Sequence, residues 1–301
     1  IYNIYQHNLP TSPELQKVRN REVTKTSSQQ EKENHITQKG RVTPLTKTSP
    51  YPNSSDTPYV SICTITHNRR DHLSRLQACI EQQTYPLHKI EWLVLDDSTA
   101  YQESLSIASE TPITIKYQRL RNKLTLGAKR NLSHKLCSGE IIVYMDDDDF
   151  YFPERVRHAV NTLSSSKASI AGCTYLHIYF TDDNQLWLSG PFSKKHATAG
   201  TFAMTKEFAR HHFYDNNASC NEEKSFLANY SIPLQQLDPL QTMICISHST
   251  NTFDKRRMRQ KGATRRMRPL PPGQSNPLKQ KLWAAGFKFQ PRKPSININR
   301  A

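Results

Sequence analysis

Four consecutive aspartates, Asp146, Asp147, Asp148 and Asp149, end an almost wholly apolar run at residues 141–145. Carboxylates this close together repel one another, so a fold keeps them only where solvent or a cation compensates their charge. Oxygen ligands of this kind favour Mg²⁺ or Mn²⁺, with water and phosphate oxygens in the remaining coordination positions. The cluster predicts a site for a divalent metal and an anion; the competing interpretation is an exposed acidic turn.

Two further acidic pairs stand where predicted elements end or begin. Asp96 and Asp97 follow the apolar residues 90–95, and Glu222 and Glu223 open a predicted helix. Each pair has a structural alternative: the aspartates could cap a turn, and the glutamates could complement the positive end of the helix dipole. In an open α/β sheet, Asp96–Asp97 and the four-aspartate cluster would lie side by side along one edge.

The elements that must position these residues alternate between strand and helix in the first half of the chain. Apolar, β-branched runs predict strands, and apolar residues at helical spacing predict helices. We expect strands at 59–65, 90–95, 113–117 and 141–145, and helices at 73–83, 126–136 and from Pro153 onward. This alternation predicts an α/β fold with an open, mostly parallel, Rossmann-like sheet flanked by helices, in which ligands gather at the carboxyl ends of the strands.

The second half of the chain has a less regular pattern. We expect strands at 170–180, 187–188, 200–204 and 242–247, and helices at 206–211 and 222–230. The sequence contains no internal repeat. No apolar run approaches the roughly 20 residues needed to cross a bilayer, so the sequence excludes a membrane-spanning protein.

The charge of the chain is concentrated in its flanks. The net charge is +15, yet residues 58–250 carry 19 Lys and Arg against 20 Asp and Glu. This distribution disfavours a uniformly basic nucleic-acid-binding fold. Residues 1–57 are polar with little apolar pattern and are expected to form a disordered leader or linker. Residues 251–301 read as a basic, Pro-rich tail without an obvious core.

The six cysteines contain no close pair such as C-x-x-C, which disfavours zinc and disulfide frameworks. Reduced, buried thiols indicate a reducing compartment, so a cytoplasmic location is the default expectation. Eight Lys or Arg in residues 255–268, with the apolar residues 282–287 beyond them, allow a peripheral contact with an anionic membrane or acidic glycan, a nucleic-acid patch, or a solvated charge run.

Taken together and in order, five segments resemble the nucleotide-sugar-binding half of family 2 glycosyltransferases with the GT-A fold. The resemblance covers about residues 58–160 and rests on the set rather than on any one motif. It implies a domain at 58–250, with a nucleotide-sugar half at 58–160 and an acceptor half at 161–250. The segments are Val60-Ser61-Ile62 with Asn68-Arg69, Trp92-Leu93-Val94-Leu95-Asp96-Asp97-Ser98, Gly127-Ala128-Lys129-Arg130-Asn131, Gly139-Glu140-Ile141-Ile142 running into the four aspartates, and Pro153-Glu154-Arg155.

The resemblance implies roles on the donor side. Asp97, beside Asp96, would bind the nucleobase, and the loop that carries Thr66, Asn68, Arg69 and Arg70 would line the same pocket. Lys129 and Arg130 would lie near the diphosphate. Asp146, Asp147 and Asp148 resemble the Asp-x-Asp motif, with Asp146 near the ribose and the metal and Asp148 as the direct ligand of Mn²⁺ or Mg²⁺. Asp149 would support the loop or face the donor sugar, and the fourth aspartate leaves two alignments of the motif open.

The resemblance also implies roles on the acceptor side. An inverting transfer needs a base for the acceptor hydroxyl, and Glu223 is favoured over Glu222, with Asp215 and Asp238 as weaker candidates. His248 is expected to reach the metal or the diphosphate, or to be an ordinary surface histidine. His67 would pack near the base or finish a turn. Trp187 and Tyr175 would stack on a sugar or belong to the core. The basic run could also close over the donor diphosphate.

The resulting hypothesis is an inverting, metal-dependent glycosyltransferase that moves a sugar from a nucleoside diphosphate donor, UDP by default, to a carbohydrate or other hydroxyl acceptor. One alternative is a nucleotidyltransferase, but the loop at 66–70 lacks the glycines that such an enzyme would use to bind phosphate. The other alternative is a non-catalytic protein that binds nucleic acid or glycan through the basic tail.

Overall fold

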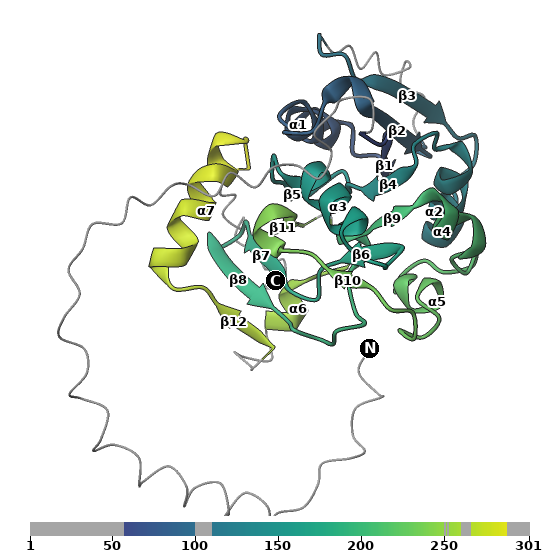
Figure 1. Ribbon diagram of the computed structural model, residues 1–301. Helices are drawn as coiled ribbons and strands as arrows, with labels where there is room; N and C mark the ends of the chain where they lie inside the picture. The colour runs from purple at the N-terminus through teal and green to yellow at the C-terminus, as the bar shows by residue number, and fades with distance from the viewer. Residues whose placement is uncertain (1–56, 100–109, 250, 252, 260–265, 288–301) are drawn as a thin grey trace, which may run out of the picture. The chain divides into compact units, whose positions relative to one another are not determined.

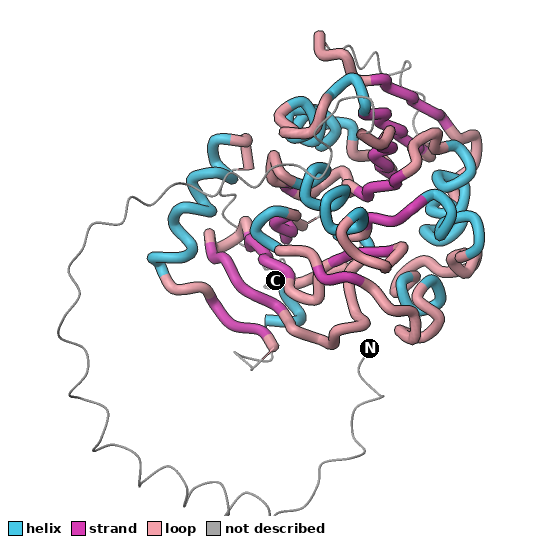
Figure 2. Tube along the Cα trace, in the orientation of Figure 1, coloured by secondary structure: helices cyan, strands magenta, loops and turns pink. Residues whose placement is uncertain are grey.

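The computed structural model describes residues 57–99, 110–249, 251, 253–259 and 266–287. The predicted polar leader lies almost wholly outside these residues, as does the last part of the basic tail. Figure 1 labels the helices and strands, and Figure 2 separates them by colour from the loops.

A central sheet of seven strands has the order β10-β6-β9-β4-β1-β2-β3. Its four neighbours β4, β1, β2 and β3 are parallel, while β9 is antiparallel to both β4 and β6. The strands are β1 (Val60–Thr66), β2 (Ile90–Asp96), β3 (Thr114–Arg119), β4 (Ile141–Tyr144), β6 (Ile170–Gly172), β9 (Ala203–Thr205) and β10 (Gln235–Gln236). The predicted α/β fold with a mostly parallel central sheet is therefore confirmed.

Helices flank this sheet, and their ends follow from local chemistry (Figure 1). Threonine hydroxyls accept the N–H of a first-turn residue at two helix starts, Thr125 from Ala128 and Thr205 from Phe208. The helices are α1 (Arg70–Glu81), α2 (Leu126–Leu136), α3 (Arg155–Ser164), α4 (Lys206–His211) and α5 (Glu223–Phe226), with 3₁₀ turns η3 (Leu87–Lys89), η4 (Ala199–Thr201) and η5 (Pro239–Gln241). The bounds predicted for α2 and α4 match those observed.

A second sheet, with the order β12-β8-β7-β11-β5, was not expected. Its strands are β5 (Phe150–Tyr151), β7 (Leu176–Phe180), β8 (Gln185–Ser189), β11 (Met243–Ser247) and β12 (Met267–Pro269). The predicted single strand at 170–180 is wrong, because the chain leaves one sheet after β6 and enters the other at β7. Between β6 and β7, two backbone N–H groups donate to side chains instead of to a neighbouring strand. Cys173 N–H donates to the Thr201 hydroxyl, and Thr174 N–H donates to the Gln236 amide oxygen.

The described part of the segment beyond residue 251 packs into the domain, contrary to the expected tail without a core. Strand β12 pairs with β8, and helix α7 (Pro272–Ala284) follows it. Leu282 and Phe287 are buried in the core, which favours packing on the domain for residues 282–287 over a membrane contact. Arg259, in helix α6 (Arg256–Arg259), lies over the rings of Phe180 and Trp187. Within the described segments, no helix is both long and apolar enough to span a bilayer.

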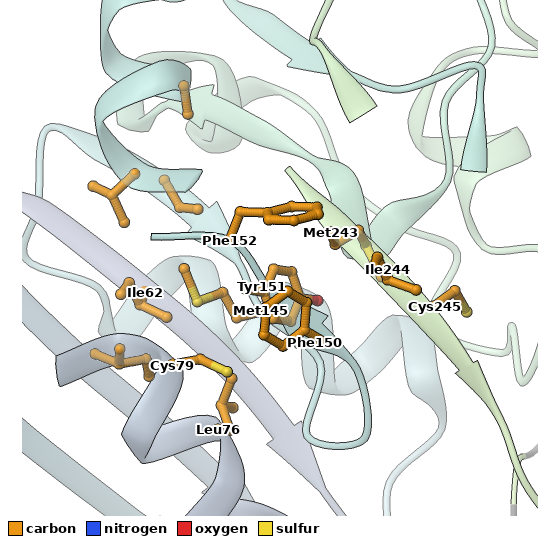
Figure 3. Packing of buried hydrophobic residues seen from close by; sticks show 14 of the residues in the cluster. Ile62, Leu76, Cys79, Met145, Phe150, Tyr151, Phe152, Met243, Ile244 and Cys245 are labelled. Atoms are coloured by element: carbon orange, nitrogen blue, oxygen red, sulfur yellow. The ribbon is translucent and has the colours of Figure 1, made fainter. Parts of the chain in front are cut away.

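One hydrophobic cluster joins the two sheets. Figure 3 shows Ile62 of β1 and Leu76 of α1 close to Phe150 and Tyr151 of β5, with Met243 of β11 beyond them. Trp187 is 8 % exposed and belongs to this core, so the idea that it stacks on a sugar is wrong. Five of the six cysteines are buried, as expected for thiols in apolar segments.

Two buried histidines predict how stability depends on pH. Burial lowers the pKa of His134 and of His177 from 6.5 to about 4. Between these values the unfolded chain binds more protons than the folded chain, so the free energy of unfolding falls as pH drops below about 6.5. We expect a loss of roughly 1 kcal/mol per histidine between pH 7.5 and 5.5 in urea denaturation.

The variant His177→Leu should therefore show a weaker dependence of the free energy of unfolding on pH than the parent. His211→Leu is the matched control, because His211 is exposed and pairs with Glu207 on the surface. An unchanged dependence in His177→Leu would contradict the assignment.

Candidate active site

The parallel register brings the predicted functional residues to one edge of the central sheet. Thr66, at the end of β1, pairs with Asp96, at the end of β2, and Cys63 pairs with Tyr144, the last residue of β4. The four aspartates therefore begin beside the loop that follows β1. Three hydrogen-bonded groups of side chains occupy this edge.

The first group joins the loop after β1 to two of the aspartates. The Thr66 hydroxyl donates to Asp147 Oδ2 at 2.6 Å, and Arg69 Nη1 lies 3.1 Å from Asp147 Oδ1 and 2.9 Å from Asp148 Oδ2. His248 Nε2 lies 3.1 Å from the same Asp148 oxygen. The structure thus brings together five residues that the sequence had assigned to donor or metal.

The carboxyls of this cluster titrate differently from one another. Burial, followed by the charge of Asp148, raises the pKa of Asp147 to about 7. Burial acts on Asp148 too, but His248, Lys255 and Arg69 together hold its pKa below the usual value. Burial raises the pKa of Asp149, whose Oδ1 accepts the Ile246 N–H at 2.8 Å. Asp149 therefore fits the supporting role expected for it, and Asp148 is the most strongly ionised of these three.

The chemistry of the donor set fits a hard divalent cation. Asp148 Oδ2 and His248 Nε2 lie 3.1 Å apart in a direct contact, which a cation held by both residues would replace. Mg²⁺ is commonly held by one or two carboxylates together with phosphate oxygens. Among the described residues, no group of three or more His, Cys, Asp or Glu side chains gathers at a common point. The third expected ligand, Asp146, instead places Oδ1 2.9 Å from Arg130 Nη2.

The second group surrounds Asp97, which is 2 % exposed. Its Oδ1 lies 2.7 Å from Lys129 Nζ and 3.0 Å from His67 Nδ1, and its Oδ2 accepts the Leu124 N–H at 2.9 Å. Lys129 was expected near the diphosphate, but its ammonium pairs with Asp97 and donates to the Thr66 carbonyl. A fixed carboxylate of this kind can accept a hydrogen bond from an N–H of a ligand.

Asp96 serves the structure of the sheet edge. Its carboxylate accepts from the Tyr117 and Ser98 hydroxyls and lies 3.4 Å from Arg119 Nη1. Burial opposes ionisation, but these hydrogen bonds, led by that of Ser98, lower the pKa of Asp96 below its usual value. Asn68, expected in the donor pocket, is tied to the loop after β2, since its Oδ1 accepts the Thr99 N–H at 3.0 Å.

The third group links the aspartates to the glutamate pair through a buried arginine. Arg130, 3 % exposed, contacts Asp146, lies 3.8 Å from Glu222 Oε1 through Nε, and covers the Tyr144 ring at 4.4 Å. Burial, then the charge of Glu223, raises the pKa of Glu222 to about 7 although Arg130 opposes the shift. Arg130 was expected near the diphosphate; the structure gives it two carboxylate neighbours instead.

Glu223 differs from Glu222 because it is only half-buried. Its Oε1 accepts the Ala199 N–H at 3.1 Å. A Cβ on the next residue, Gly200, would stand 2.8 Å from Asp146 Oδ2, so Gly200 of the η4 turn lies against the Asp146 side chain. Glu223 and Asp146 thus contact neighbouring residues of one short turn, and a half-buried carboxylate here can accept a proton.

The two weaker candidates for the base lie in other surroundings. Asp215 Oδ1 accepts the Asn217 N–H at 2.9 Å, and Asp238 caps η5 by accepting the Leu240 N–H at 2.9 Å.

The predicted helix at 222–230 is shorter than expected: α5 ends at Phe226, and Ala228, Asn229 and Tyr230 all have positive φ.

Two residues at the site were missed from the sequence. Asn251 Nδ2 donates to Asp148 Oδ2 at 3.0 Å, and the His72 ring lies 5.1 Å from the His248 ring. Spacing could have indicated both, because Asn251 stands three residues after His248 and His72 three residues after Arg69, but polar residues at such spacing are common in loops and helix starts.

Comparison with known proteins identifies a family and a fold. The family described as Glycosyl transferase family 2 matches residues 61–232. No curated protein matches the chain. Among solved structures, TarS 1-349 from S. aureus is similar with a TM-score of 0.51 at 16% identity, over 62% of this chain and 60% of that one. The chain thus corresponds to well under two thirds of that structure.

A second solved structure shares the fold. The mannosyltransferase PcManGT from Pyrobaculum calidifontis, in complex with GDP-Man and Mn²⁺, has a TM-score of 0.50 at 12% identity, over 75% of this chain and 69% of that one. TarS 1-349 has also been solved with UDP, at a TM-score of 0.50 and 16% identity, over 62% of this chain and 60% of that one. At these identities the likeness concerns the fold alone.

Proposed function

The chain belongs to glycosyl transferase family 2, and on that premise we propose that it moves a sugar from a nucleoside diphosphate donor to a hydroxyl acceptor in a metal-dependent, inverting reaction. The observation that carries the proposal is the η4 turn, where Ala199 contacts Glu223 while Gly200 lies against Asp146. A proton acceptor and Asp146 of the acidic cluster therefore contact adjacent residues of one turn.

In the proposed reaction the acceptor oxygen attacks the anomeric carbon as the bond from that carbon to the phosphate oxygen breaks. Glu223 takes the proton of the acceptor hydroxyl, and the nucleoside diphosphate departs with the bonding electrons. Asp97 receives an N–H of the nucleobase. Asp148 and His248 would hold Mn²⁺ or Mg²⁺, which when bound stabilises the negative charge that develops on the phosphate.

The nucleotide is proposed to be UDP. The N–H edge of uracil suits a buried carboxylate such as Asp97, and the similar TarS structure was solved with UDP. Guanine also presents an N–H edge, and PcManGT was solved with GDP-Man. GDP-sugars are therefore the comparison that a test of the donor has to include.

Thermal unfolding with nucleotide sugars tests the proposal. We expect UDP-sugar and Mn²⁺ together to raise the midpoint by several degrees, with much smaller shifts from either alone, because a ligand that binds only the folded state stabilises it by mass action. GDP- and dTDP-sugars are the matched controls for the base. Indifference to every combination would contradict the proposal, and salt-sensitive binding of RNA in its place would favour a binding protein.

A further inference from the structure

An aromatic cluster lies on the loop between β8 and η4. The Phe192 and His196 ring centroids are 4.7 Å apart, and the His196 and Tyr230 centroids are 5.1 Å apart. Phe192 is 37 % exposed and Tyr175, at the start of the neighbouring strand β7, is 38 % exposed. Within the cluster, Phe192 is exposed and His196 and Tyr230 are half-buried, so part of its aromatic surface is open to a ligand.

Hydrogen bonds fix the backbone of this loop. The Thr174 hydroxyl accepts the N–H groups of Phe192 and Ser193 at 2.9 and 3.2 Å. Gln236 Nε2 donates to the carbonyls of Lys194 and His196 at 3.0 and 3.3 Å. The rings are thus presented by an ordered backbone, and a ligand that stacks on them pays little entropy to organise the site.

Tyr230 reaches the cluster through strained backbone. Ala228, Asn229 and Tyr230 have φ values of 45°, 55° and 59°, a left-handed region that a bulky residue such as tyrosine rarely adopts. Hydrogen bonds hold the segment, since Asn229 N–H donates to the Lys224 carbonyl at 2.8 Å and Ser231 N–H to the Leu227 carbonyl at 3.0 Å. Strain that the surroundings maintain in this way is typical of ligand sites.

The cluster is close to the carboxylate assigned as the base. Ala199, which donates to Glu223, follows His196 by three residues, and three residues span at most about 11 Å. Tyr230 lies in the segment that directly follows α5, the helix that Glu223 begins. A short oligosaccharide could therefore contact both the rings and Glu223.

We propose that Phe192, His196 and Tyr230 form an acceptor platform on which the apolar face of a pyranose ring stacks, so that the acceptor is a carbohydrate. The flat C–H face of a sugar suits an aromatic ring, while its hydroxyls remain free for polar groups. This inference rests on the proposed function, because it uses Glu223 as the base that marks the acceptor side.

Steady-state kinetics of Phe192→Ala test the platform, with UDP-sugar as donor and a panel of nitrophenyl mono- and disaccharides as acceptors. We expect the acceptor KM to rise roughly 10- to 50-fold, while the donor KM and the hydrolysis of donor by water stay unchanged. Phe192→Tyr should restore the acceptor KM. Phe213→Ala is the matched control, because Phe213 is 57 % exposed outside this loop.

Saturation-transfer NMR of the same saccharides supplies a readout that does not need turnover. If the wild-type protein transfers saturation to the sugar C–H protons and Phe192→Ala does not, the platform is supported, even when no donor is consumed. A lack of donor consumption would reject the proposed function. The platform would be overturned if Phe192→Ala had the same acceptor KM and the same saturation as the wild-type protein. The proposed function would still stand in that case if the wild-type protein hydrolyses the donor.

Discussion

Replacing Glu223 with glutamine is expected to abolish sugar transfer while donor binding stays intact. Glutamine retains a side-chain oxygen that can accept the Ala199 N–H, so the η4 turn keeps its contact. It cannot take a proton from the acceptor, and loss of a general base typically slows a reaction by roughly 10²- to 10⁴-fold. Initial rates of transfer together with calorimetric binding of UDP would separate the two effects.

Three other carboxyls serve as controls for Glu223→Gln. Glu222→Gln removes a buried partner of Arg130, so we expect it to lower the free energy of unfolding as well as the rate. Asp215→Asn and Asp238→Asn should keep nearly full transfer, because each carboxylate holds a local turn. Full turnover in Glu223→Gln would reject Glu223 as the base, and loss of transfer only in an aspartate variant would move the assignment there.

The part of the site that follows from single strands was predictable from the sequence. The apolar residues 141–145 and 90–95 can lie only inside a covered sheet, and the polar residues that end them must then meet at its carboxyl edge. Thr66 and Arg69 were expected to line the nucleobase pocket, and Asp147 and Asp148 to belong to the Asp-x-Asp motif; the structure joins the four in one hydrogen-bonded group.

The second sheet could not be predicted, because its formation depends on contacts between distant segments. The residues at 170–180 are β-prone throughout, and nothing local reveals that Thr201 and Gln236 will interrupt the strand at Cys173 and Thr174. Likewise, the sequence suggests that Arg259 is solvated, but in the structure its guanidinium lies over the rings of Phe180 and Trp187. Cation–π contacts and side-chain caps of this kind are tertiary in origin.

The sequence also could not predict which carboxylates pair with Lys129 and Arg130. Lys129 and Arg130 are adjacent on α2 and suggest a common phosphate, yet their side chains reach different carboxylates, Asp97 and Asp146. Successive residues of a helix point about 100° apart, so two adjacent cations rarely share one partner. Arg130 thus contacts Asp146, whereas Asp148 is the carboxylate that lies beside a histidine, His248.

Changing Asp148 to asparagine is therefore expected to remove the enhancement of UDP binding by Mn²⁺. The amide oxygen can still accept from Arg69 and Asn251, so the loop should keep its shape, but the negative charge that attracts a cation is gone. We expect UDP affinity in Mn²⁺ to fall at least roughly tenfold, toward the value in EDTA, because Asp148 would hold the cation whose charge stabilises the bound diphosphate. Isothermal titration calorimetry in Mn²⁺ and in EDTA measures this difference directly.

Asp183→Asn is the matched control, since it removes one surface carboxylate that pairs with Arg259 in the second sheet region. It should leave the difference in UDP affinity between Mn²⁺ and EDTA unchanged. Thermal unfolding of both variants without ligand shows whether the fold is retained. If Asp148→Asn folds normally and keeps the full enhancement by Mn²⁺, the cation is not held by Asp148. Asp146 then becomes the carboxylate to test, because its side chain is more exposed than those of the other three aspartates.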